Sequence, residues 1–136
     1  MSAVDGITMQ QKIKNQLLRN TGSVVCEQAS SIPQFRCWIV IRAIPTEYIH
    51  RTGDNILRLK DLNRDRIPPD ADRIFAVRRV FARTKCIEEN WDLGPDDEIN
   101  ALLAICYTFE ELMTFLAQLS IDTNALIEPW NTDFPL

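Results

Sequence analysis

The chain has 136 residues, of which 46% are apolar and 25% charged, as in ordinary globular proteins. This composition excludes wholesale disorder, and the length predicts a single domain spanning residues 1–136. No apolar run approaches the ~20 residues that cross a bilayer, and the N-terminus lacks the basic and apolar regions of a secretory signal. We therefore expect a cytoplasmic protein with no membrane partner.

The first third of the chain predicts one helix and two strands. Residues 8–19 carry Met9, Ile13 and Leu17 at helical spacing. Residues 23–28 are short and β-branched, which favours a strand. Residues 34–44 alternate as a longer strand whose first face is apolar, while its second face combines Trp38 with two arginines.

The middle third predicts a weaker and a stronger strand. Residues 56–62 could form a short edge strand, and residues 63–72 are rich in turn-forming and charged residues, as expected of a loop. Residues 73–85 are apolar on both faces near their start, which predicts a central strand. The Arg78-Arg79 pair within it suggests a β-bulge.

The last third predicts helices. Pro95 followed by three acidic residues is typical of a helix start, and the core stripe of this helix would be Ile99, Leu102, Leu103 and Cys106. Thr108 and Glu111 match a capping box that begins a second helix ending near residue 119, although one continuous helix is an alternative. A helical turn at residues 123–127 and an extended tail follow.

These patterns together predict an α+β fold. It would comprise an N-terminal helix, a three- to four-stranded and mostly antiparallel sheet, and a helical C-terminal third packed on one sheet face. The four cysteines each lie in an apolar run, which predicts buried free thiols.

Charge divides the chain into a basic middle and an acidic end. Residues 36–85 hold 12 basic and 6 acidic side chains, whereas residues 86–136 hold 11 carboxylates and no Lys, Arg or His. An uncompensated surface of this kind attracts a basic macromolecule and speeds its capture. Immunity proteins, inhibitors and adaptors use the same physics. The candidate partner-binding residues are Glu88, Glu89, Asp92, Asp96, Asp97, Glu110 and Glu111.

Two alternatives remain open. In the first, the acidic helices pair internally with the strand arginines, and the charge has no partner outside the chain. In the second, the protein is a small-ligand binder or enzyme with an anion-binding pocket between sheet and helices. The residues of that pocket would be Arg36, Trp38, Arg42, Tyr48 and His50.

Other chemistry has little support in the residues. A sequence pI near 5.0 argues against nucleic acid as the main partner, because phosphate neutralisation dominates that affinity. Asp61, Asn63 and Asp65 imitate a calcium loop, but Arg66 occupies the position that needs glycine. A single histidine excludes a multi-histidine metal site. We therefore expect no metal, no cofactor and no catalytic residues, and binding is favoured over catalysis.

Self-association could use the apolar residues of the C-terminal tail, Trp130, Phe134 and Leu136.

Overall fold

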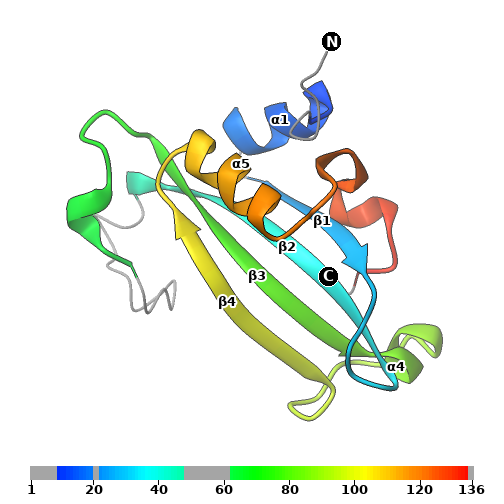
Figure 1. Ribbon diagram of the computed structural model, residues 1–136. Helices are drawn as coiled ribbons and strands as arrows, with labels where there is room; N and C mark the ends of the chain where they lie inside the picture. Colours follow the sequence, from blue (N-terminus) through cyan, green and yellow to red (C-terminus); the bar gives the residue numbers. More distant parts are fainter. Residues whose placement is uncertain (1–8, 20–21, 48–61, 135–136) are drawn as a thin grey trace.

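One four-stranded antiparallel sheet organises the α+β fold (Figure 1). The computed structural model describes residues 9–19, 22–47 and 62–134. The strands follow chain order across the sheet and are β1 (Ser23–Gln28), β2 (Phe35–Pro45), β3 (Arg73–Arg83) and β4 (Glu98–Cys106). Strands β2 and β3 pair along their whole lengths, so the two longest alternating segments of the sequence form the centre of the sheet.

Helices α1 (Gln11–Leu18) and α5 (Phe109–Gln118) cover the same face of the sheet, which we call the helix face (Figure 1). Their apolar stripes pack on alternate residues of the strands, as amphipathic helices do. The core of this layer includes Ile13, Leu17, Ile39, Ile41, Val77, Leu112 and Leu116, all fully buried. Each such side chain contributes about 1.5–3 kcal/mol through the area that it removes from water.

The other side of the sheet, called the second face, is covered at its two ends by separate apolar clusters. One cluster joins Ile74 and Ile105 to Ile67, which follows the 3₁₀ helix η2 (Arg64–Arg66). The other surrounds Trp38, which is covered by Phe134 and by residues of α4 (Thr84–Glu88). The space between the clusters leaves part of the sheet accessible.

The C-terminal tail is tied to the outer edge of β1. Ile127 pairs with Val25 through two backbone hydrogen bonds of 2.8 and 2.9 Å, and the 3₁₀ helices η3 (Thr123–Ala125) and η4 (Pro129–Asn131) flank this bridge. The tail then reaches the second face, where the ring of Phe134 meets Trp38 edge-on at 5.5 Å between centroids.

Most of the predicted elements are confirmed. Strands β1, β2 and β3 lie within two residues of their expected bounds, and the N-terminal helix begins three residues later than the expected segment 8–19. The pairing of β3 with β4 shifts register between Val77 and Arg78, next to the expected bulge. Thr108 caps α5 as predicted, because its hydroxyl accepts a hydrogen bond from the backbone N–H of Glu111 at 3.0 Å. The predicted strand at residues 56–62 falls outside the described residues except for Leu62.

The helix predicted to begin at Pro95 and to end near Tyr107 is wrong, because Glu98–Cys106 form strand β4. Gly94 to Asp97 form a tight turn, with the N–H of Asp97 donating to the carbonyl of Gly94 at 3.0 Å. Proline and aspartate fit the central positions of such a turn as well as they fit a helix start. The turn brings the apolar run onto the free edge of β3, and Ile99, expected in the core, is 44% exposed.

None of the helices within the described ranges is long and apolar enough to cross a membrane.

Candidate functional site

Helix α4 and the segment after it carry the first group of acidic residues. The sequence did not predict this helix, which follows β3 directly. Asn90 ends it in the left-handed conformation, at φ 56°. The N–H groups of Asn90 and Trp91 donate to the carbonyls of Ile87 and Cys86 at 3.3 and 2.8 Å. This pair of bonds is the Schellman motif, and it turns the chain so that residues 91–97 run back towards β4.

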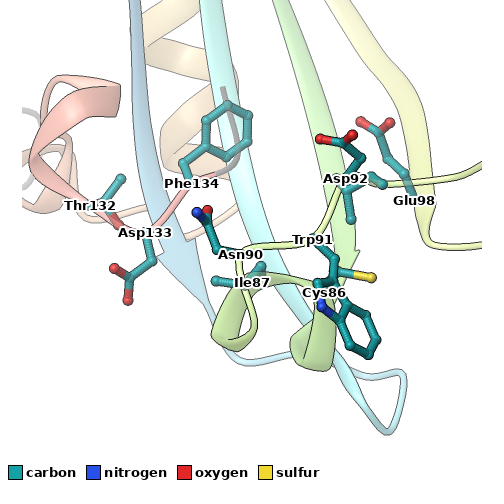
Figure 2. Close-up of a pocket in the computed structure, with 10 residues that line it drawn as sticks. Cys86, Ile87, Asn90, Trp91, Asp92, Glu98, Thr132, Asp133 and Phe134 are labelled. Carbon is teal, nitrogen blue, oxygen red and sulfur yellow. The ribbon is translucent and has the colours of Figure 1, made fainter.

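An open pocket of about 690 Å³ lies between this segment and the C-terminal tail. Asp92 and Glu98 line one side, and Asp133 and Phe134 line the other. Figure 2 shows the carboxylates of Asp92 and Glu98 directed the same way, while the ring of Trp91 points away from them. Three carboxylates therefore line the pocket, of which Asp133 is paired with Arg36, and the side chains of Trp91 and Phe134 complete the lining.

Five of the seven predicted partner-binding carboxylates are exposed. They are Glu88, Glu89, Asp92, Asp96 and Glu110, and none of them has an ion-pair partner in the part of the chain that the structure describes. Glu88 and Glu89 lie at the C-terminal end of α4, where the helix dipole disfavours negative charge. Local folding therefore does not explain their presence.

The other two carboxylates serve the fold. Asp97 accepts from Nε of Arg83 at 2.7 Å and from the N–H of Gly94 at 3.0 Å. The Arg83 hydrogen bond is the main reason that the pKa of Asp97 lies below its ordinary value. Glu111 pairs with Arg66 at 3.2 Å and also accepts from the N–H of Tyr107 at 3.0 Å.

The structure divides the predicted acidic surface into two parts. Glu110 and Glu111 begin α5, whereas the other five residues lie around α4, at the opposite end of β4 (Figure 1). At roughly 3.3 Å per residue, the length of β4 separates the two groups by about 25 Å. Asp97 is paired with Arg83, and we call the other four residues of the α4 group, Glu88, Glu89, Asp92 and Asp96, the acidic patch.

The alternative anion pocket is only partly assembled. Arg36, Trp38 and Arg42 share the second face, but Arg36 is held by Glu27 at 2.6 and 2.7 Å and by Asp133 at 3.2 Å. Trp38 is fully buried, and the guanidinium of Arg36 stacks on its ring at 5.0 Å. Arg42 is exposed, whereas Tyr48 and His50 lie outside the described residues.

Sequence reasoning missed the aromatic component of the site. Trp91 is 54% exposed, and the ammonium of Lys85 lies 5.5 Å from its ring centroid. Nothing in the sequence distinguishes this exposed tryptophan from a buried one, so only the structure identifies it. The same is true of Asp133, since the tail alone brings it to the pocket.

The thiols offer no nucleophile. All four cysteines are free and buried, as predicted. Burial raises the pKa of Cys26 and of Cys106 to about 11, so both remain protonated at neutral pH, and only the thiolate reacts. Within the described ranges, no group of three or more His, Cys, Asp or Glu side chains is placed to hold a metal ion.

No protein-family model, curated protein or solved structure matches the chain. Function is therefore inferred from the residues and their geometry.

Proposed function

We propose that the protein is a non-enzymatic binding protein that presents the acidic patch to a basic macromolecular partner, as an immunity protein, inhibitor or adaptor does. The observation that supports this proposal is the set of four exposed carboxylates around α4 that have no ion-pair partner among the described residues. A folded chain gains nothing from such a cluster, since like charges close together are repulsive.

The pocket beside the patch supports a basic rather than a neutral partner. A lysine or arginine side chain of the partner would meet Asp92 and Glu98 on one wall, with Trp91 at the rim. A charge-assisted hydrogen bond to either carboxylate would be about twice as strong as a neutral one. The exposed patch around the pocket would steer the partner and raise its association rate at low salt.

A pair of charge-matched variants tests the proposal. The first variant, Glu88→Gln, Glu89→Gln and Asp92→Asn, removes three charges from the acidic patch. The control, Asp65→Asn, Asp70→Asn and Asp122→Asn, removes three exposed carboxylates elsewhere. The net charge of the two variants is identical, so any difference between them belongs to the position of the charges.

The first measurement uses an oligo-arginine peptide as a defined cation, with binding recorded at low and at moderate salt. The patch variant should bind the peptide about tenfold more weakly than the wild type, and the control should resemble the wild type. Equal losses in both variants would show that only net charge matters, which would contradict the proposal.

The second measurement identifies the partner. Wild type, patch variant and control are each immobilised in lysate of the native host, and retained proteins are identified by mass spectrometry. We expect a basic protein that the wild type and the control retain and the patch variant loses, with weaker retention as salt rises. Identical sets of retained proteins from all three would refute the proposal.

A further inference from the structure

The sheet sorts the strand arginines into different environments. Arg36 and Arg83 are occupied by carboxylates, through Glu27, Asp133 and Asp97. Arg73, the first residue of β3, pairs with Asp72. Arg79 pairs in register with Ile39, which places it on the helix face. Arg42 and Arg78 remain, and both belong to the second face, in the space between its two apolar clusters.

Arg42 and Arg78 are neighbours across the β2–β3 ladder. Arg42 is opposite Ala76 and Arg78 is opposite Val40, so the two arginines occupy one diagonal. Diagonal neighbours in an antiparallel pair lie roughly 7–8 Å apart, which long side chains span easily. Arg42 is exposed and Arg78 half-buried, so both guanidinium groups can be reached by a ligand.

Two further polar side chains extend this diagonal to the outer strands. Ser23 of β1 is the register partner of Arg42. Asn100 of β4 accepts a hydrogen bond from Nη1 of Arg78 at 3.4 Å through its Oδ1, which leaves its amide NH₂ available as a donor. A row of hydrogen-bond donors therefore crosses all four strands on one face.

This pair of arginines lacks a counter-charge in the part of the chain that the structure describes. No carboxylate there lies within ion-pair distance of Arg42 or Arg78, although Arg36, Arg66 and Arg83 each have one. Two neighbouring like charges on a sheet destabilise it. An anion from outside the chain would remove that repulsion, and both arginines would stabilise the bound anion.

We propose that Arg42 and Arg78, with Ser23 and Asn100 beside them, bind the phosphate group of a small molecule. Phosphate carries about two negative charges near neutral pH, so it neutralises both arginines, whereas a carboxylate neutralises one. Each planar guanidinium can contact two phosphate oxygens. The ligand is small because the acidic patch and the net charge of −4 repel a long polyanion.

Glu98 makes the site distinguishable from the acidic patch. It lies two residues before Asn100 on β4, on the same face of the sheet, where its charge opposes a bound phosphate. Glu98→Gln should therefore strengthen phosphate binding about threefold, an effect of the size of one exposed charge pair. The same change should weaken oligo-arginine binding if the proposed function is correct, so the two proposals can fail separately.

The experiment titrates the full chain with inorganic phosphate, and then with methyl phosphate, at constant ionic strength maintained with chloride. Wild type should show saturable binding by calorimetry and a rise in melting temperature, by mass action on the native state. Arg42→Gln and Arg78→Gln should each weaken binding about 10- to 100-fold, as expected for lost hydrogen bonds to a charged group. Arg42→Lys keeps the charge but loses the planar fork, so an intermediate loss is expected.

The control is Arg19→Gln, which removes an exposed arginine at the C-terminal end of α1, the helix that covers the opposite face of the sheet. A loss in this variant equal to that in Arg42→Gln would reveal an adventitious ion only and overturn the proposal. Absence of saturable binding in the folded wild type would also overturn it. Preferential binding of single-stranded RNA through the same arginines, with a steep salt dependence, would contradict the small-molecule assignment.

Discussion

Asp97 illustrates at the residue scale how a carboxylate can stabilise the fold. Its hydrogen bonds with Arg83 and Gly94 favour the charged form, and its pKa in the folded state is therefore lower than in the unfolded state. A group of this kind stabilises the protein fully above its unfolded pKa, near 3.9. The contribution is lost as the pH falls through the lowered folded pKa.

We therefore expect Asp97→Asn to flatten the acid side of the stability profile. Between about pH 5 and about pH 2, the free energy of unfolding of the wild type should fall more steeply than that of the variant. Denaturant unfolding at successive pH values measures the difference. Asp92→Asn is the control, since Asp92 is exposed and has no ion pair among the described residues. Parallel profiles for the wild type and Asp97→Asn would contradict this prediction.

Thr108 gives a second prediction at this scale. Its hydroxyl satisfies the otherwise unpaired N–H of Glu111 in the first turn of α5. Thr108→Ala should lower the free energy of unfolding by about 1 kcal/mol, as expected for the loss of an N-cap. Thr114→Ala, at an exposed position of the same helix, should have little effect. Similar losses in the two variants would show that the cap contributes nothing.

The sequence was sufficient for such local features and insufficient for distant pairings. The capping box identified Thr108 because its partner is three residues away. The ion pair of Arg36 with Asp133 joins residues 97 positions apart, and it forms only because the folded tail brings Asp133 to the sheet. Internal pairing and an exposed acidic surface were posed as alternatives. The structure contains ion pairs at Asp97, Asp133 and Glu111 and, beside them, exposed carboxylates in the acidic patch.

Strand β4 shows at the element scale why a local pattern can be misleading. Residues 101–107 are apolar nearly all round, which fits a buried helix or a strand equally well. The preceding proline and aspartates were assigned to a helix start, whereas they form the turn that leads into β4. Pairing with the free edge of β3 then decided the outcome, because tertiary context overrides intrinsic propensity.

The assignment of residues 98–106 to a strand predicts that shortening two side chains to alanine lowers the free energy of unfolding by different amounts. Ile99 is 44% exposed on β4, so Ile99→Ala should lower the free energy of unfolding by less than about 1 kcal/mol. Leu112 of α5 is fully buried, so Leu112→Ala should lower the free energy of unfolding by about 2–5 kcal/mol. Urea unfolding of both variants makes the comparison. A large cost at Ile99 would support the helix with Ile99 in its core stripe.

At the scale of the whole molecule, the division into a basic middle and an acidic end is partly neutralised by folding. Among the described residues, three ion pairs join an arginine of residues 36–85 to a carboxylate of residues 86–136: Arg36–Asp133, Arg66–Glu111 and Arg83–Asp97. Two of these pairs lie at opposite ends of the sheet, and the pair of Arg36 with Asp133 joins the sheet to the tail. The acidic patch near α4 and the two arginines on the second face are among the charges that have no ion pair within the described residues.

The tail has two apolar anchors with different surroundings. Phe134 packs edge-on against the buried Trp38, whereas Trp130 is 62% exposed. Phe134→Ala should lower the free energy of unfolding by about 2 kcal/mol, from lost apolar burial and a lost aromatic contact. It should also shift the tryptophan fluorescence of the folded protein to longer wavelength, because Trp38 gains solvent. Trp130→Ala should leave stability nearly unchanged.

The same two variants test self-association through the tail, because a residue committed to the fold is unavailable to a second copy. We expect any concentration-dependent rise in mass to depend on Trp130 and not on Phe134, as measured by sedimentation velocity over a range of concentrations. Phe134→Ala should lower the free energy of unfolding without changing the mass of the assembly in solution. Trp130→Ala should lower the mass of the assembly in solution without changing the free energy of unfolding. The opposite assignment, with Phe134→Ala dissociating a stable oligomer, would mean that the packing of Phe134 on Trp38 is replaced in solution by contact between chains.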